Sequence, residues 1–244
     1  MPLISAAICP HPPYLIPEVA GAAAPEWAGL HTACTESLRR LRIPQFGVKA
    51  DGWAVFDSFD LRPADASTPD LVVIVGGDSS TRTYDGPGSY SSLEQQGIDW
   101  DFGWGRTTDN PIPLPLSLSL GHWILFGCSP TALLVADLEL QAVAFDAPPQ
   151  ECAELGRALA ARAERVAMLV IGDGTGSDHT RIASALAHAD AAALDRLDPT
   201  PTPSGRAPWQ VLAGAAEGHR FTGELRSDEK SHRAGFFVAN WFRA

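Results

Sequence analysis

The sequence has few basic residues, few cysteines and no long apolar run, and each shortage excludes a class of protein. Its 18 Lys and Arg residues stand against 29 Asp and Glu residues, which gives a formal net charge of −11. Such a chain lacks the basic surface that binds nucleic acids or anionic membranes. No apolar run approaches the roughly 18 residues of a membrane-spanning helix, and the first residues lack a basic leader. We therefore expect a cytoplasmic protein without nucleic-acid or membrane partners.

The four cysteines are too scattered for a zinc knuckle or a disulfide framework. Cys9, Cys34, Cys128 and Cys152 include no Cys-x-x-Cys pair, a spacing that is typical of zinc sites and redox motifs. Free cysteines behave as small hydrophobic residues. We expect them to be reduced and mostly buried.

What the sequence does contain is an alternation of apolar runs and amphipathic helices. Three short runs without charge, at Leu3–Cys9, Leu71–Val75 and Val166–Ile171, predict buried strands. Helices are predicted at Pro25–Arg42 and Pro149–Arg165, because each segment has a proline near its start and basic residues at its end. A helix that runs into a buried strand is the unit from which parallel sheets are built. The pattern predicts an α/β protein.

One large domain is the expected organisation, spanning residues 1–244. A chain of 244 residues with 45% hydrophobic composition can bury a core of that size. Residues 80–115 interrupt it with an irregular stretch rich in Gly, Ser, Asp, Pro and aromatic residues. A stretch of this length inside a compact domain is typical of a functional loop or lid.

The periodicity leaves two segments open. Leu114–Phe126 fits a buried helix or a strand, with His122 as a core histidine by default and as a site residue in the alternative. Leu133–Phe145 fits a hairpin or two consecutive strands. Further helices are predicted over 178–194 and Ala207–Glu217.

The last forty residues combine a polar segment with an apolar one. Glu224–Arg233 is interpreted as a solvated loop, the usual meaning of a charged run, or as the carrier of a site acid, Asp228 or Glu229. Ala234–Trp241 predicts a terminal strand. Its aromatic end is compatible with a homo-oligomer interface.

Polar residues follow three of the predicted strands. His11 stands among three prolines after the first strand, Asp78 follows the second, and Asp173 follows the third, with His179 at the start of the next helix. Taken singly, His11 is equally compatible with a surface turn, and the Asp78 segment favours a turn capped by the aspartate. In open α/β sheets, however, ligands bind outside the carboxyl ends of the strands, so these residues are expected to converge. Imidazole together with carboxylates suits Fe(II), Mn(II) or Zn(II).

Several stretches resemble the LigB-type family of class III extradiol ring-cleavage dioxygenases, in particular its uncharacterised actinobacterial single-chain members. The resemblance rests on ICPHPPYLIPEV, LVVIV, LPLSLSLG, VIGDGTGSDH, RAPWQVLAGAA and the ending GFFVANW. The chain is also similar to the Memo proteins, which share the fold without being established ring-cleaving enzymes. The resemblance implies a three-layer α/β/α sandwich with a mostly parallel or mixed central sheet.

The same resemblance implies a ferrous ion held by two His and one Glu, with a further His as acid/base, acting on a catechol and dioxygen. His11 matches the first ligand and His179 lies close to the acid/base position, while Asp228 or Glu229 falls near the acidic ligand. Where the family has its second metal His, this chain has Gly-Gly-Asp-Ser. Asp78 is expected to replace that histidine.

Three functions follow as hypotheses. The first is a ring-opening dioxygenase with His11, Asp78 and Glu229 as metal ligands and His179 as acid/base, with Fe(II) as the expected metal and Zn or Mn as alternatives. The second is a catalytically silent, Memo-like binding or scaffold protein without a metal, because fold does not fix function. The third is a metal-dependent hydrolase that uses Asp78 and Asp173 around Zn or Mn.

Overall fold

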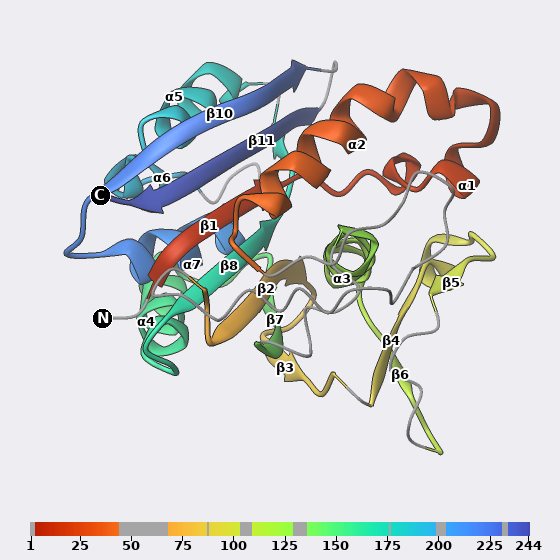
Figure 1. Cartoon of the computed structure of the whole chain (residues 1–244), viewed down its shortest axis with the longest axis horizontal. Helices are drawn as coiled ribbons and strands as arrows, with labels where there is room; N and C mark the ends of the chain where they lie inside the picture. Colours follow the sequence, from red (N-terminus) through yellow and green to blue (C-terminus); the bar gives the residue numbers. More distant parts are fainter. Residues whose placement is uncertain are drawn as a thin grey trace, which may run out of the picture.

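A mixed sheet forms the centre of the molecule. The computed structural model describes residues 3–43, 68–86, 88–102, 109–128, 136–175, 177–198, 204–230 and 234–244. The strands of the sheet are β1 (Leu3–Cys9), β2 (Leu71–Asp78), β3 (Arg82–Tyr84), β7 (Asp137–Ala144), β8 (Val166–Ile171), β9 (Gly174–Thr175), β10 (Phe221–Lys230) and β11 (Ala234–Arg243). Their order is β10-β11-β1-β8-β2-β7-β3, with β9 paired to β11 (Figure 1). The four central strands run parallel, while β3, β10 and β11 are antiparallel to their neighbours.

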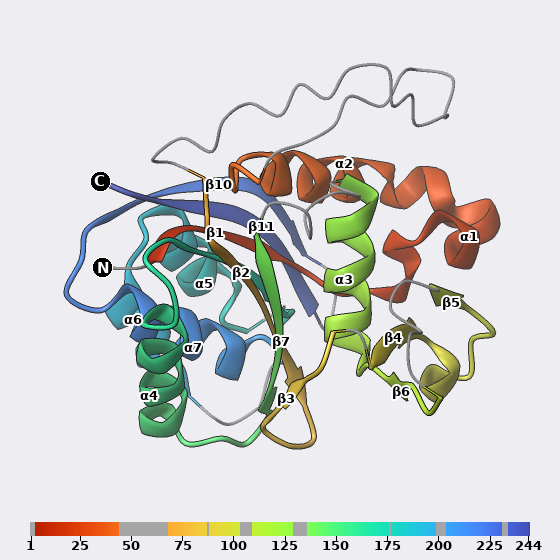
Figure 2. The same cartoon turned by 60° about the horizontal axis from the view of Figure 1, so that its bottom comes forward.

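Helices cover both faces of this sheet (Figure 2). One face carries α2 (Ala24–Arg39) and α3 (Leu116–Cys128), and the other carries α4 (Pro149–Ala160), α5 (His179–Ala187), α6 (Ala191–Asp195) and α7 (Arg206–Ala216). Four shorter helices are α1 (Pro17–Ala20), η1 (Pro13–Leu15), η2 (Gly21–Ala23) and η3 (Glu94–Gln96). Each face has its own buried apolar cluster. The protein is therefore the predicted three-layer α/β/α sandwich.

The stretch over 80–115 is more regular than expected. Its described part contains, besides β3, the strands β4 (Ser89–Ser92), β5 (Asp101–Phe102) and β6 (Ile112–Pro113), which form a small sheet in the order β5-β4-β6. This sheet packs against α3, where the Ser92 backbone N–H donates to Ser119 Oγ over 3.1 Å. Strands of two to four residues without apolar alternation leave little periodicity to detect.

The ambiguous segment before Phe126 is a helix. The alternating Leu-Ser pattern also fits a strand. Nine of the thirteen residues of α3 are buried, so the sequence shows no polar face with a helical period. Its serines bond to backbone, as Ser117 Oγ does to the Gly77 carbonyl over 2.7 Å. A Cβ on Gly121 would lie 2.7 Å from Ile74 and 2.9 Å from Ile171, so glycine lets this helix approach the sheet.

Two other segments differ from their predictions. The described part of Leu133–Phe145 forms the single strand β7 and no hairpin. The helix predicted over 178–194 is two helices, because Ala189 adopts a positive φ of 50° and Asp190 then caps α6 by accepting from the Ala193 N–H. The segment Trp53–Phe56, for which the sequence also predicts a strand, lies outside the described residues.

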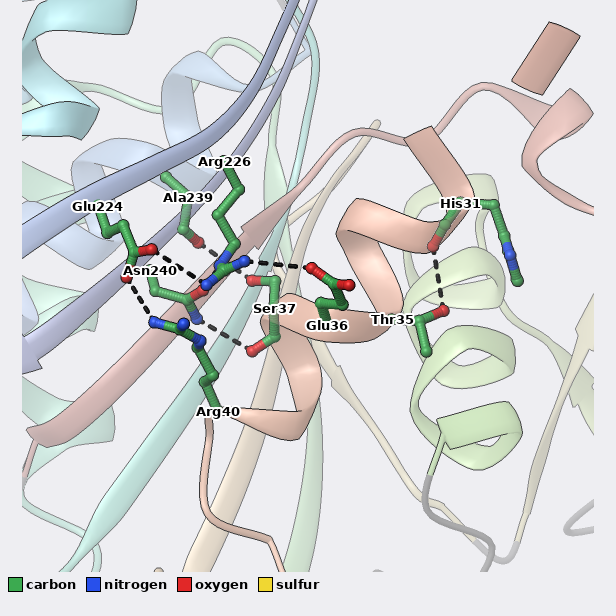
Figure 3. A network of polar contacts seen from close by, with 9 residues as sticks. All are labelled: His31, Thr35, Glu36, Ser37, Arg40, Glu224, Arg226, Ala239 and Asn240. Carbon is green, nitrogen blue, oxygen red and sulfur yellow. Dashed lines mark hydrogen bonds and ion pairs between the residues drawn. The ribbon is translucent and has the colours of Figure 1, made fainter. Parts of the chain in front are cut away.

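The charged run Glu224–Arg233, interpreted as a loop, belongs over its described part to the edge strand β10. Arg226 explains how the charges are accommodated, since its guanidinium donates to Asn240, Glu36 and Glu224 over 3.1, 3.3 and 3.0 Å (Figure 3). The amide of Asn240, which is fully buried, donates to the Ser37 carbonyl over 3.0 Å. This network ties α2 to β10 and β11.

The cysteines are mostly buried. Cys9, Cys34 and Cys152 are buried, Cys128 is half-buried, and all four are free thiols, as predicted.

Trp241 is fully buried and donates its indole N–H to the Leu186 carbonyl over 2.9 Å, so its ring belongs to the core of its own chain. Among the residues that the structure describes, no helix has both the length and the apolar composition to cross a membrane.

Candidate functional site

His11 and Asp173 meet just beyond the carboxyl ends of β1 and β8. The two strands are parallel neighbours, and the Gly172 N–H donates to the Cys9 carbonyl over 3.0 Å past their ends. The backbone N–H of His11 donates to Asp173 Oδ1 over 2.9 Å, and the ring Nδ1 lies 3.5 Å from the same oxygen. The His11 residue is 8% exposed. The predicted convergence of these two strand ends is present.

A tight turn before α7 holds Asp173 in place. Its backbone N–H donates to Ser204 Oγ over 3.2 Å, and its carbonyl accepts from the Gly205 N–H over 2.9 Å. A Cβ on Gly172 would lie only 2.3 Å from Gly205 Cα, so this approach requires a glycine. The backbone that carries this carboxylate is therefore fixed by the ends of β1 and β8 and by the start of α7.

A second pair joins His179, the first residue of α5, to Asp228 on β10 through a hydrogen bond between Nε2 and Oδ1. The imidazole packs on Phe237 with 4.7 Å between ring centroids. A Cβ on Gly235 would lie 2.7 Å from Nδ1 and 2.9 Å from the Phe237 ring, so glycine leaves room for both rings. Neighbouring residues on a strand point to opposite faces, which explains why β10 directs Asp228 and not Glu229 toward this histidine.

The two pairs flank the first residues of β11. Gly174, which follows Asp173, pairs with Gly235, whose Cα faces His179. In both histidines Nδ1 is buried and has no hydrogen-bond partner among the described residues. The topology therefore brings His11, Asp173, His179 and Asp228 to the same region of the sheet.

Asp78 turns to a different set of partners. Its carboxylate accepts from the Ser79 N–H over 2.7 Å, from the Tyr84 hydroxyl over 3.2 Å and from Arg82 over 3.5 Å. The Arg82 guanidinium lies 4.4 Å over the Tyr84 ring. Burial, aided by the negative charge of Asp78, raises the pKa of Tyr84 to about 12. The turn into β3 thus engages Asp78, an arrangement that sequence reasoning missed.

Glu229 does not take the position expected of a metal ligand. Its side chain is exposed, and Ser227 Oγ donates to it over 3.4 Å. Over the described ranges, no group of three or more His, Cys, Asp or Glu residues is placed to hold a metal ion. The predicted ligand set of His11, Asp78 and Glu229 is therefore not assembled. Asp78 and Asp173 likewise form no such group, so the hydrolase centre is not assembled either.

His122 is a core histidine, as the default prediction has it. Its Nδ1 is hydrogen-bonded to Ser91 Oγ at 2.9 Å, and Phe126 and Phe102 pack on its ring with centroids 4.5 and 6.1 Å away. Burial lowers its pKa to about 4. The residue connects α3 to the small sheet and takes no part in the His–Asp pairs.

Aromatic side chains lie on the other side of β11. Tyr14, three residues after His11, contacts Trp27 with 5.6 Å between centroids, and Trp27 contacts Phe236 at 5.7 Å. Tyr14 is half exposed. A cavity of about 540 Å³ lies elsewhere, beside Arg82 and Tyr84, and none of the predicted site residues lines it.

The ferrous ion that the resemblance implies does not fit the described donor set. Two of the expected donors, Asp78 and Glu229, have other partners, and the two histidines each face a single carboxylate. A ferrous oxygenase site takes two histidines and one carboxylate on one ion. The described residues provide no such set around His11 or His179.

Comparison with known proteins yields no functional assignment. No family model matches the chain, and no curated protein matches its sequence. Among solved structures, a crystal structure of an uncharacterized protein from Escherichia coli K12 matches over 98% of this chain and 99% of that chain, with 11% sequence identity and a TM-score of 0.45. A likeness at this level assigns no function, so the site has to be argued from its own residues.

Proposed function

We propose that this chain is a LigB-like protein that binds a small catechol-type aromatic compound at the carboxyl ends of β1 and β8, without opening its ring. The polar contacts of the ligand are His11 and Asp173. The proposal corresponds to the second of the three hypotheses, a binding protein on an enzyme fold.

The observation that carries the proposal is the fixed geometry of His11. Prolines on both sides restrict its backbone, and Asp173 accepts its N–H over 2.9 Å. Because Nδ1 faces the same carboxylate at 3.5 Å, Nε2 on the far side of the ring is the nitrogen left for a ligand. A neutral imidazole nitrogen in this position accepts a hydrogen bond from a phenolic hydroxyl. A side chain that is already held in its binding conformation loses little conformational entropy when the ligand binds.

Aromatic surface near the pair supports a planar ligand. Tyr14 follows His11 by three residues, and its ring is half exposed. The ring contacts Trp27, which in turn contacts Phe236. Aromatic rings in tilted or edge contact add about 0.5–1.5 kcal/mol beyond area burial. Polar groups beside apolar rings are the usual composition of small-molecule sites.

A ring-opening dioxygenase is the second candidate. The unpartnered ring nitrogens of His11 and His179 favour it, because imidazole nitrogen is a ligand of ferrous ions. The grouping of donors speaks against it, since neither histidine has two further donors beside it within the described residues.

Catechol binding and oxygen uptake separate the two candidates. Catechol is titrated anaerobically into chelator-treated protein while tryptophan fluorescence is recorded, and oxygen uptake is then measured after addition of Fe(II). The proposal predicts saturable binding without metal, at least tenfold weaker binding in His11→Ala, and no oxygen uptake. His188→Ala is the matched control, because His188 is exposed and its ring is hydrogen-bonded to the Ser184 carbonyl of α5, away from both His–Asp pairs. Ring opening with Fe(II) would establish the enzyme instead, and absence of binding would end the proposal.

A further inference from the structure

The two members of the second His–Asp pair differ in exposure. The His179 side chain is 11% exposed, whereas that of Asp228 is 40% exposed. Oδ1 of Asp228 is engaged by His179 Nε2. Oδ2 is left without a hydrogen bond from the residues that the structure describes. The accessible part of this pair is thus a carboxylate oxygen and not an imidazole nitrogen.

The surroundings of Nδ1 select one tautomer of the His179 ring. Nδ1 is buried, has no hydrogen-bond partner in the part of the chain that the structure describes, and lies against Gly235, where a Cβ would be 2.7 Å away. A hydrogen on Nδ1 would be a buried donor without an acceptor, which is unfavourable. With the hydrogen on Nε2, the ring donates to Asp228, and Nδ1 carries no hydrogen that would need an acceptor. The geometry therefore favours the Nε2–H tautomer.

We infer that Asp228 is the ligand-contacting group of this pair and that His179 is its positioning residue. The ring packs on Phe237 and against Gly235, which lie on the same face of β11, and its N–H fixes the direction of the Asp228 carboxylate. The resemblance implies the opposite distribution of roles, with His179 as the acid/base group and an acid near 228 as a metal ligand. Here the burial of the ring and the exposure of the acid decide between the two.

The free oxygen of Asp228 suits a hydroxyl donor. A carboxylate accepts hydrogen bonds and donates none when ionised, and charge-assisted bonds are stronger than neutral ones. This inference rests on the proposed function: the hydroxyl belongs to the same catechol-type ligand, because the pair at His179 and the pair at His11 both flank the start of β11.

The tautomer is tested on the ligand-free wild-type protein. Two-bond ¹H–¹⁵N correlation spectra are recorded at about pH 8, above the ordinary histidine pKa of about 6.5, and a His179→Gln variant assigns the signal. We expect the Nε2–H tautomer in the wild type and a mixture in Asp228→Ala, which lacks the acceptor. A wild-type ring protonated mainly on Nδ1 would overturn the positioning role.

The contact is tested with catechol as the probe. Asp228→Asn keeps the shape of the side chain and loses its charge, so binding is expected to weaken at least tenfold. Glu229→Gln, the next residue on the opposite face of β10, is the control and is expected to bind as the wild type does. His179→Gln, whose amide can still donate to Asp228, is expected to lose less. If the wild type binds and Asp228→Asn binds equally, this inference fails alone; if the wild type binds no catechol, the proposed function fails with it.

Discussion

The backbone N–H of His11 donates to the carboxylate of Asp173 over 2.9 Å, although 162 residues separate the two in the chain. The bond exists because β1 and β8 are parallel neighbours that end together. The bond fixes the turn after β1 that carries the imidazole, and its acceptor belongs to the segment after β8. The first prediction follows from this bond.

Asp173→Ala removes the acceptor and is expected to weaken catechol binding about tenfold, or about 1.4 kcal/mol, because the His11 turn loses its anchor. Asp173→Asn keeps an oxygen that can accept the His11 N–H and is expected to lose less. Fluorescence titration of both variants measures the difference. Equal affinity of Asp173→Ala and wild type would show that the bond does not prepare the site.

Burial of His122 predicts a pH-dependent stability. Its pKa is lowered to about 4 by burial, whereas histidine in an unfolded chain titrates near about 6.5. Between about pH 4 and about pH 6.5 the unfolded state binds more protons than the folded state. The stability that neutral His122 contributes is therefore fully present above about pH 6.5 and is lost as the pH falls through about 4. The loss amounts to about 3 kcal/mol at most.

Urea unfolding between those pH values checks this prediction in wild type and His122→Gln. The difference between the two proteins isolates the histidine from the carboxylates that titrate in the same range. We expect a shallower pH dependence in the variant. An identical dependence would mean that His122 is hydrated or protonated without cost in the folded protein.

The network of Figure 3 predicts that Asn240 is more important for stability than the charges around it. Asn240→Leu removes the acceptor of the Arg226 Nε–H and one of two donors to the Ser37 carbonyl, the other being the Arg40 N–H. It is expected to lower the free energy of unfolding by about 2 kcal/mol or more. Arg40→Ala removes only a pair with Glu224 in which both side chains are about half exposed. Its expected cost is about 0–1 kcal/mol. Urea midpoints that are equal for the two variants would refute the ranking.

Two helical glycines are expected to respond in opposite directions. A Cβ on Gly156 of α4 would lie 2.0 Å from the Val211 carbonyl of α7, so Gly156→Ala must push the helices apart and is expected to cost about 1–3 kcal/mol or more. Gly29 of α2 is exposed with nothing within 4 Å of its Cβ position. Gly29→Ala is expected to stabilise by up to about 1 kcal/mol. Thermal unfolding of both variants tests this, and the same sign in both would contradict it.

Local pattern was sufficient for most of the sheet and helices. Val166–Ile171 is a strand over its predicted length, and Ala24–Arg39 is a helix close to the predicted bounds. Both have apolar positions and end signals within their own residues. The rule that ligand residues follow parallel strands also predicted that His11 and Asp173 meet, since it requires only the order of the strands.

The elements that could not be predicted depend on distant partners. The charges of β10 were interpreted as a loop because their partner Glu36 is 190 residues away from Arg226. Asp78 was expected at the site because its engagement by Tyr84 is a packing arrangement of β3, which leaves no periodic signal. The choice between Asp228 and Glu229 requires the register of a strand that the composition did not reveal.

The iron content per chain shows directly whether His11 and Asp78 share a metal ion. Wild type, His11→Ala and Asp78→Ala are reconstituted anaerobically with Fe(II), desalted and analysed. Because Asp78 is engaged by Tyr84 and Arg82 and the described residues group no three donors, we predict less than one equivalent of retained iron and no effect of Asp78→Ala. One equivalent in the wild type that is lost in both variants would contradict the account and establish a metal shared by His11 and Asp78.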